Sequence, residues 1–311
     1  MGKIAFLFAG QGAQYVGMGK DLCDNFEVSK KVFEEADEAL GFEVSKLCFE
    51  GPKEELDKTE NTQPAIVTTS IAALKALEEK GIKGEIAAGL SLGEYSALVY
   101  SKAFQFKDAV KLVKKRGKYM QEAVPQGVGA MAAILGLEAE KVKEACIKAS
   151  SFGIVEPANY NCPGQIAIAG EAIAVEKAAQ LAKEAGAKRA VMLQVSGPFH
   201  TSMLNPAAEK LALELENVNI ENLNVPVITN VTGNYVESKD CVKELLKKQV
   251  KSSVLWEDTI RRMLADGVDT FIEIGPGKTL SGFVKKIDRS VKVFNVEDSE
   301  SLNKCVEGLR S

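Results

Sequence analysis

A serine between two glycines, in residues 89–93, is the feature that most restricts how this chain can fold. The five residues read GLSLG, an apolar run over 86–88 precedes them, and a helical pattern follows over 94–103. A glycine on each side of Ser91 indicates a backbone that bends too sharply for side chains. The segment therefore predicts a buried strand, a tight turn and a helix, with the Ser91 hydroxyl presented at the turn.

The rest of the chain indicates the class of fold in which such a turn occurs. Short β-branched runs alternate with amphipathic runs, which is typical of an α/β protein. A strand is expected over residues 3–9 and a helix from near Pro64 to Gly81, and the large domain is expected to resume with residues 225–233. A last strand, glycine turn and helix are expected over 268–287.

The middle of the chain has its own order of strands and helices. Strands are expected over 129–136, 153–161, 165–170 and 188–195, and helices over 138–150 and 172–186. The order β-α-β-β-α-β is that of a ferredoxin-like unit. We therefore predict a small ferredoxin-like subdomain, residues 125–197, inserted into a large α/β-hydrolase-like catalytic domain made of residues 1–124 and 198–311.

Charge and cysteine content exclude several functional classes. The formal net charge of −4 does not favour a nucleic-acid surface, and no apolar run approaches the roughly 18 residues that span a membrane. The six cysteines form no C-x-x-C pair and there is one histidine, so we expect no metal and no cofactor. Scattered thiols indicate a reducing cytoplasm as the location.

The one histidine, His200, is the candidate base for Ser91. A serine hydroxyl needs a base to become a nucleophile at neutral pH, and an imidazole base can only be His200. His200 follows the inserted subdomain, so it is expected to face a cleft between the two domains. Either a carboxylate or a backbone carbonyl could orient its ring. The structural alternative is that Ser91 caps a helix and His200 is an ordinary core or surface residue.

A glycine-rich loop over residues 8–19 follows the first expected strand. It lacks the third glycine of a dinucleotide motif, and Met18 stands after Gly17, where a P-loop has lysine. Nucleotide binding is therefore not expected. Such a loop can instead bring backbone N–H groups close to a site, and the N–H groups of Gln11 and Leu92 are predicted to form an oxyanion hole.

Arg116 interrupts the pattern of the helix expected over 104–124. The apolar residues of this helix recur at steps of three and four, and Arg116 borders their stripe, whereas Lys111, Lys115 and Lys118 lie on the opposite face. A guanidinium at the edge of a core needs an anionic partner. Two partners fit: an Asp or Glu of the chain, or the carboxylate of a substrate held by two parallel hydrogen bonds.

Together these stretches resemble the malonyl-CoA:acyl carrier protein transacylases of bacterial fatty acid synthesis. The resemblance extends over nearly the whole chain and is carried by residues 8–19, 89–99, 115–136, 158–170 with 197–203, and 271–282. It implies a ping-pong transfer of a malonyl group from malonyl-CoA to the phosphopantetheine thiol of acyl carrier protein, through a malonyl ester on serine. Malonyl-CoA and acyl carrier protein are then the partners, and a monomer is expected.

The same resemblance implies the roles of individual residues. Ser91 is the nucleophile, His200 the base, and the N–H groups of Gln11 and Leu92 the oxyanion hole. Arg116 pairs with the free malonyl carboxylate. The resemblance also implies that Gln249 orients His200 through its backbone carbonyl, that Gln63 lines the site, and that Asn159 lies at the cleft on the small subdomain.

Three positions depart from the family pattern. Leu90 stands where the family usually has histidine, Cys162 replaces a common serine, and Ser253 replaces a common proline. None of them removes a proposed catalytic group. They leave open a relative that serves a polyketide or malonate pathway instead of fatty acid synthesis.

Two functions of other classes compete with this one. The first is a thioesterase or esterase with the same serine and histidine, for which Arg116 would have no use on a neutral acyl chain. The second is a protein that only docks acyl carrier protein, against which the intact Ser91, His200 and glycine loop argue. Should an adduct form without Ser91, Cys162 is the other candidate nucleophile.

Overall fold

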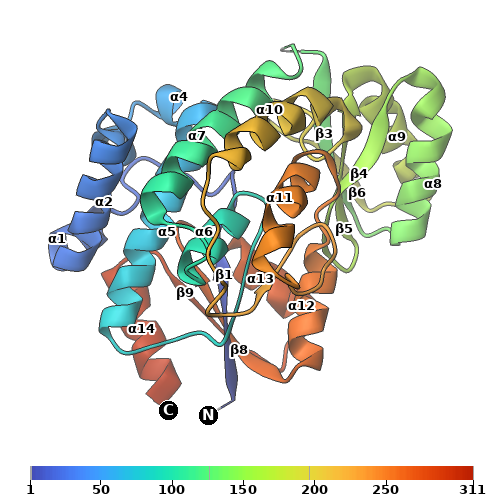
Figure 1. Ribbon diagram of the computed structural model, residues 1–311. Coiled ribbons are helices and arrows are strands. Elements are labelled where there is room, and N and C mark those ends of the chain that lie inside the picture. The colour runs from blue at the N-terminus through green and yellow to red at the C-terminus, as the bar shows by residue number, and fades with distance from the viewer. Residues whose placement is uncertain (1, 126, 196, 311) are drawn as a thin grey trace.

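The computed structural model describes residues 2–125, 127–195 and 197–310. Four residues lie outside the described ones: 1, 126, 196 and 311. All four belong to the expected domains, and residue 126 also belongs to the stretch 115–136 that carries the family resemblance. Two sheets organise the chain, a parallel one of five strands and an antiparallel one of four (Figure 1).

The large sheet has the strand order β7-β2-β1-β8-β9, and all its strands are parallel. Its strands are β1 (Lys3–Phe8), β2 (Ile86–Gly89), β7 (Val227–Ile228), β8 (Val268–Ile274) and β9 (Lys292–Val296). Its helices are α1 (Lys20–Asn25), α2 (Glu27–Leu40), α3 (Val44–Glu50), α4 (Lys53–Leu56), α5 (Thr59–Glu79), α6 (Gly93–Tyr100), α7 (Phe106–Glu122), α10 (Asn205–Glu216), α11 (Val242–Lys251), α12 (Trp256–Ala265), α13 (Thr279–Ile287) and α14 (Ser299–Arg310), with 3-10 turns η2 (Ser202–Leu204) and η3 (Lys239–Cys241).

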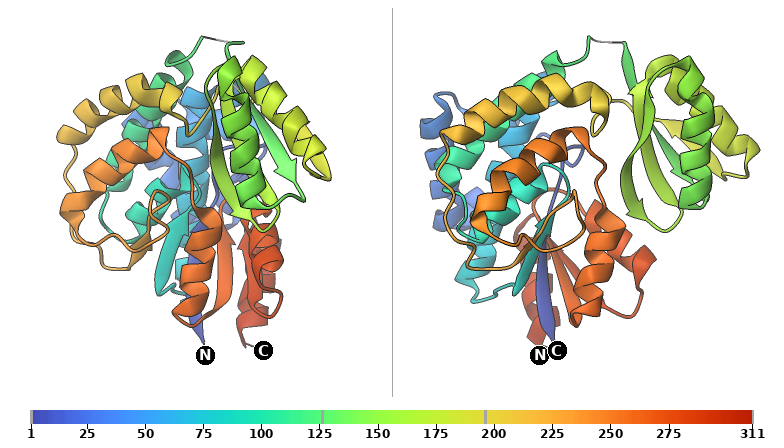
Figure 2. Two further views of the ribbon diagram at one scale, coloured as in Figure 1. Left: turned by 90° about the vertical axis from the view of Figure 1, so that its right-hand side faces the viewer. Right: turned by 45° about the vertical axis from the view of Figure 1, so that its right-hand side comes forward.

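Strand β1 divides its side chains between two hydrophobic clusters. Phe6 and Phe8 pack into the cluster beneath α2, α5 and α7, whereas Ala5 and Leu7 pack with residues of α12 and α13. Successive side chains of a strand point to opposite faces, so both faces of the sheet are covered by helices (Figure 2). Burial on both faces is why β1 is an uninterrupted apolar run in the sequence.

The small sheet has the strand order β4-β5-β3-β6 and is antiparallel throughout. Its elements are β3 (Gly129–Leu135), α8 (Ala139–Ala149), η1 (Ser150–Phe152), β4 (Val155–Cys162), β5 (Gln165–Glu171), α9 (Ala172–Glu184) and β6 (Arg189–Met192). The first strand lies between the third and fourth, as in a ferredoxin-like unit, and α8 and α9 share a core with the sheet (Figure 2). The expected class and order of elements are confirmed, whereas the domain boundaries stay a prediction.

One expected element, the helix near Pro64, was given the wrong start. Helix α5 begins at Thr59, ahead of Pro64, because the N–H groups of Asn61 and Thr62 already bond to the Lys58 carbonyl. The proline removes only its own N–H from a helix that is buried along most of its length. Strand β7 is short, because the chain turns after Ile228 and the N–H of Thr229 bonds to the Asn234 carbonyl.

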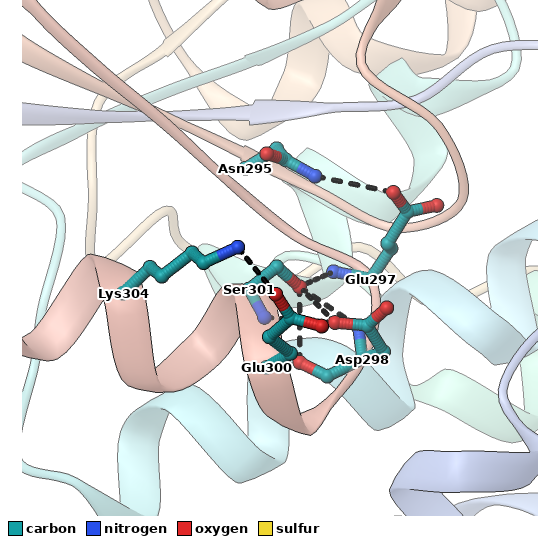
Figure 3. A network of polar contacts seen from close by, with 6 residues as sticks. All are labelled: Asn295, Glu297, Asp298, Glu300, Ser301 and Lys304. Carbon is teal, nitrogen blue, oxygen red and sulfur yellow. Dashed lines mark hydrogen bonds and ion pairs between the residues drawn. The ribbon is translucent and has the colours of Figure 1, made fainter.

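The carboxyl ends of β1, β2 and β8 meet at one edge of the large sheet, and each is followed by a glycine-containing turn. The turn after β8 is held from the C-terminal segment, where Glu297 Oε2 accepts the N–H of Gly277 at 2.8 Å. Glu297 precedes a reciprocal cap of α14 (Figure 3). Asp298 Oδ1 accepts the N–H of Ser301 at 2.8 Å, and Ser301 Oγ accepts the N–H of Asp298 at 3.0 Å. The cap therefore helps to fix one wall of the strand-end region.

All six cysteine side chains are described, and all are free thiols. Within residues 2–125, 127–195 and 197–310, no helix combines the length and the apolar character needed to cross a membrane. The same residues contain no group of three or more histidine, cysteine, aspartate or glutamate side chains placed to hold a metal ion.

Candidate active site

The turn between β2 and α6 requires both of its glycines for steric reasons. A Cβ atom on Gly89 would lie 1.9 Å from the carbonyl carbon of Gly93, and one on Gly93 would lie 2.1 Å from the carbonyl oxygen of Phe8. The strained residue is Ser91 itself, whose φ of 52° is in the left-handed region that side chains disfavour. The turn predicted from the sequence is confirmed, with Ser91 at its tip.

A cleft of about 560 Å³ lies above this turn, between the two sheets. Ser91, His200 and Gln11 line it from the large-sheet side, and Met131 and Asn159 line it from the small sheet. Ser91 is 8% exposed and His200 is 4% exposed, so a reacting group reaches them only through the cleft.

Ser91 and His200 are hydrogen-bonded. The distance from Ser91 Oγ to His200 Nε2 is 2.7 Å, and that from His200 Nδ1 to the backbone carbonyl oxygen of Gln249 is 2.9 Å. A carbonyl oxygen can only accept, so Nδ1 carries the proton and Nε2 is free to accept the one from Ser91. The sequence left open whether a carboxylate or a backbone carbonyl orients the ring, and the structure shows the backbone carbonyl of Gln249 in this role.

Arg116 is buried and touches the same hydroxyl. Its Nη2 donates to Ser91 Oγ at 3.1 Å and to Gln249 Oε1 at 3.0 Å, and its Nη1 donates to Gln63 Oε1 at 2.9 Å. Its Nε has no partner among the described residues. No carboxylate of the described chain lies within 4 Å of the guanidinium. Of the two partners expected for Arg116 from the sequence, an Asp or Glu of the chain is therefore absent within 4 Å among the described residues.

Burial and charge set the protonation of the site. Burial, and secondly the positive charge of Arg116, lower the pKa of His200 from 6.5 to about 4. The imidazole is therefore neutral near pH 7, as a base must be. Burial also lowers the pKa of Arg116, but a guanidinium remains charged in proteins. The site thus combines a neutral imidazole with a cation surrounded by neutral oxygens.

The proposed oxyanion donors are two backbone N–H groups. Within the part of the chain that the structure describes, the N–H groups of Gln11 and Leu92 donate to no protein acceptor. Leu92 follows the serine directly and stands at the start of α6, where N–H groups are unpaired and the helix dipole favours negative charge. Gln11 belongs to the loop after β1, and Gly10 beside it could not carry a Cβ, which would lie 2.5 Å from the Leu90 carbonyl oxygen.

The remaining expected residues take different places. Gln63 is buried in α5 and connects two others, because its Oε1 accepts from Arg116 and its Nε2 donates to Gln11 Oε1 at 3.3 Å. Leu92, Gln249, Gln63 and Arg116 lie beneath the cleft and do not line it. Asn159 lines it, but its side chain bonds to none of the other seven expected residues.

Sequence reasoning missed two buried residues, Glu94 and Asn230. Asn230 Oδ1 accepts the N–H of Ser91, and its Nδ2 donates to the Gly89 carbonyl at 2.8 Å. Glu94 accepts from the N–H of Asn230 and from Gln249 Nε2. The available signal was a polar residue in an otherwise buried setting: a glutamate in the apolar run of α6, and an asparagine just past the carboxyl end of β7.

The three departures from the family pattern also have structural places. Leu90 lines the cleft beside the glycine loop. Ser253 Oγ donates to the Pro157 carbonyl at 2.6 Å, so the serine ties its loop to β4. Cys162 is buried against the core of the large domain, and burial raises the pKa of its thiol. It does not line the cleft, which argues against Cys162 as the alternative nucleophile.

Comparisons with known proteins agree on one family. The family model described as an acyl transferase domain matches residues 5–305. The malonyl CoA-acyl carrier protein transacylase of Bacillus subtilis is 52% identical over 311 residues, which cover 100% of this chain and 98% of the relative. The crystal structure of the malonyl CoA-acyl carrier protein transacylase of Clostridium perfringens is 58% identical, with a TM-score of 0.97 over 99% of this chain and 97% of that one. A malonyl-transacylase solved in complex with its type II PKS acyl-carrier protein is 43% identical, with a TM-score of 0.96 over 98% of this chain and 99% of that one.

Proposed function

This chain belongs to the acyl transferase family, among the malonyl-CoA:acyl carrier protein transacylases, and we propose that it carries out their reaction through a malonyl ester of Ser91. It is an acyltransferase that moves the malonyl group from malonyl-CoA to the phosphopantetheine thiol of acyl carrier protein. One observation carries the residue assignment: Ser91 Oγ lies within hydrogen-bond distance of both His200 Nε2 and Arg116 Nη2.

The first half-reaction forms the ester and releases coenzyme A. Ser91 Oγ attacks the thioester carbonyl carbon while its proton passes to His200 Nε2. The carbonyl oxygen becomes an anion held by the N–H groups of Gln11 and Leu92. When the tetrahedral intermediate collapses, the C–S bond breaks and the proton on Nε2 passes to the sulfur of coenzyme A. The positive charge that His200 carries in between is stabilised by the Gln249 carbonyl at Nδ1.

The second half-reaction repeats these steps with a different thiol. The phosphopantetheine thiol gives its proton to His200 Nε2, and its sulfur attacks the ester carbonyl in the same oxyanion hole. The bond from carbon to Ser91 Oγ then breaks, and the proton returns to the serine oxygen. One imidazole therefore serves as base and acid in both directions.

Arg116 provides the selection for an acyl group with a free carboxylate. Arg116 is a buried cation with no carboxylate within 4 Å among the described residues, and it binds a malonyl carboxylate in place of the neutral oxygens around it. The carboxylate would also balance the positive charge that lowers the pKa of His200, so it favours protonation of the base in the transition state. Gln63 supports the guanidinium, and Asn159 contacts the acyl thioester from the small-subdomain side of the cleft.

A labelling experiment tests this function. Incubation with labelled malonyl-CoA should place one malonyl group on the intact protein, and digestion should locate it on the peptide that contains Ser91. Adding acyl carrier protein should move the label to the carrier and restore the mass of the free protein. Ser91→Ala should take up no label. Label on another peptide would refute the assignment, and label lost to water at an equal rate with and without carrier would identify a hydrolase.

Pathway, location and assembly belong to the same proposal. Fatty acid synthesis is the proposed pathway. Its acyl carrier protein should be compared with a type II polyketide carrier protein as acceptors in the second half-reaction. Six free thiols support the cytoplasm as the location. The monomeric state stays a prediction, which sedimentation at several protein concentrations would test.

A further inference from the structure

A buried carboxyl group, that of Glu94, lies near the reacting serine, but it makes no hydrogen bond to the Ser91 side chain. Glu94 is in the first turn of α6, three residues after Ser91, and is 2% exposed. Neither half-reaction uses it. A carboxyl group this deeply buried needs hydrogen-bond partners, and the partners of Glu94 lead to both sides of the reacting group.

The first partner is the side-chain amide of Gln249. Gln249 Nε2 donates to Glu94 Oε2 at 2.8 Å and to the Ser91 carbonyl at 3.0 Å, while Gln249 Oε1 accepts from Arg116 at 3.0 Å. Glu94 Oε2 and the Ser91 carbonyl are both acceptors, so the NH₂ group of Gln249 must face them. The amide oxygen of Gln249 must then face Arg116. Glu94 thus fixes which end of the Gln249 amide the guanidinium meets.

The second partner is the backbone of Asn230. The same oxygen, Glu94 Oε2, accepts the N–H of Asn230 at 2.9 Å. The Asn230 side chain bonds to the N–H of Ser91 and to the carbonyl of Gly89, which lie on the two sides of the strained turn. Glu94 is therefore connected to the nucleophile through Asn230 and to the guanidinium through Gln249.

Hydrogen bonding, and not ion pairing, describes these contacts. Arg116 makes no ion pair with Glu94 within 4 Å. The N–H of Asn230 and the amide of Gln249 both donate to one oxygen of Glu94. Burial raises the pKa of the carboxyl group above its usual range, although hydrogen bonds from Asn230, Gln249 and Thr229 and the more distant charge of Arg116 act to lower it. A neutral amide oxygen at the same place could accept the same two hydrogen bonds, so Glu94→Gln separates acceptor geometry from charge.

We propose that Glu94 is a positioning residue for acyl transfer, which acts as a hydrogen-bond acceptor to hold the Gln249 amide toward Arg116 and the Asn230 backbone against the serine turn. The inference rests on the proposed function. Because the Gln249 branch ends at Arg116, loss of Glu94 lowers transfer of malonyl more than transfer of acetyl. Because the Asn230 branch ends at Ser91, both acyl groups lose some rate.

The test compares Glu94→Gln, Glu94→Ala and the control Ser96→Ala. The Ser96 hydroxyl is buried on the same helix and has no hydrogen-bond partner among the described residues. The rate of coenzyme A release from malonyl-CoA and acetyl-CoA is measured per active site. The active sites are counted from the burst of acyl-enzyme, so protein that is not folded does not lower the measured rate. For malonyl-CoA, Glu94→Ala should lower kcat/KM about 10- to 100-fold and lower the malonyl-to-acetyl ratio. Glu94→Gln should stay within about threefold of the unmodified chain, and Ser96→Ala should equal it.

A Gln249→Leu background locates the effect. Leucine there keeps the backbone carbonyl that orients His200 but removes the amide, so Glu94→Ala should no longer change the malonyl-to-acetyl ratio. Equal losses in Glu94→Gln and Glu94→Ala would overturn the proposal in favour of a charge effect. Normal rates per active site in Glu94→Ala would overturn it in favour of a purely structural role. Failure of the unmodified chain to transfer malonyl at all would instead refute the proposed function.

Discussion

Ser91 and His200 meet at 2.7 Å although both have left-handed backbone conformations, with φ of 52° and 62°. This region is uncommon for residues other than glycine, although histidine adopts it more often than most, and each such residue costs on the order of 1 to 3 kcal/mol. The surrounding structure maintains both: Asn230 holds the serine turn, and Gln249 holds the imidazole. The strain aims the two side chains at each other from segments that are far apart in the chain.

The first prediction concerns the protonation of His200. Its imidazole should titrate with a pKa of about 4, because burial and the nearby Arg116 both disfavour the charged ring. The chain has one histidine, so the imidazole signal in a proton NMR titration needs no further assignment. In Arg116→Ala the pKa should rise toward 6.5, whereas in Lys115→Ala, changed at an exposed neighbour on α7, it should stay near 4. A value near 6.5 in the unmodified chain would contradict the buried, neutral base.

The second prediction follows from the same shift and concerns stability. The pKa of His200 is lower in the folded state than the value of 6.5 expected when unfolded, so the unfolded chain binds the extra proton first. The free energy of unfolding should therefore fall as the pH is lowered from about 6.5 to 4. The full effect is about 3 kcal/mol, since one pKa unit corresponds to about 1.4 kcal/mol.

Urea unfolding of the unmodified chain and of His200→Gln across this pH range measures the difference. The comparison of the two proteins is needed because the titration of Glu273 changes the free energy of unfolding in the opposite direction. Burial raises the pKa of Glu273 to about 7, so its stabilising contribution is lost as the pH rises from about 4.5 to 7. Parallel pH profiles for the two proteins would show that His200 makes no such contribution.

The geometry that the sequence anticipated, with the turn at Ser91 and His200 beside it, could be predicted from local pattern and from scarcity, whereas the roles of these residues stay predictions. The glycines around Ser91 restrict the backbone wherever the turn lies in the fold, and a single histidine leaves one candidate imidazole. The helix pattern also identified Arg116 as a cation beside a core, because helical spacing alone places it there. Its partners, however, lie on three other segments, and only the structure identifies them as neutral oxygens.

The residues that sequence reasoning missed depend on contacts between distant segments. Asn230 lies in a run of β-branched residues that favours a strand, and its importance comes from bonds to residues near position 90. Glu94 resembles an ordinary helix glutamate until its burial is known. The early start of α5 has a similar cause, since burial of that helix outweighs the local preference to begin it at Pro64.

The third prediction concerns acyl selection by Arg116. Arg116→Ala should lower kcat/KM for malonyl-CoA by about 10- to 150-fold, the equivalent of a charge-assisted hydrogen bond of about 1.5 to 3 kcal/mol. Loading of acetyl should be unchanged or faster, because Ser91 Oγ loses a competing donor and His200 becomes easier to protonate. Acyl-enzyme formation from the two coenzyme A esters, measured by intact mass against time, makes the comparison. Equal losses for both esters would show that Arg116 does not pair with the carboxylate.

The fourth prediction concerns the base in catalysis. His200→Ala should lower the rate of malonyl transfer by roughly two to four orders of magnitude, because no other imidazole is present to accept the Ser91 proton. In the unmodified chain, kcat/KM should decline only as the pH falls toward about 4, where the free enzyme begins to protonate Nε2. A near-normal rate in the variant would remove His200 from the mechanism.

The fifth prediction separates steric need from conformational freedom at the serine turn. Gly89→Ala should destabilise the protein by at least about 3 kcal/mol, because its Cβ would overlap the Gly93 backbone and neither segment can move without disturbing the sheet edge. Gly282→Ala is the matched control: it lies inside α13 with nothing within 4 Å of the added atom. In that position alanine should stabilise the helix by up to about 1 kcal/mol. Thermal unfolding of both variants decides the matter, and a Gly89→Ala protein as stable as the unmodified chain would mean that the turn tolerates a side chain and is looser than its backbone contacts indicate.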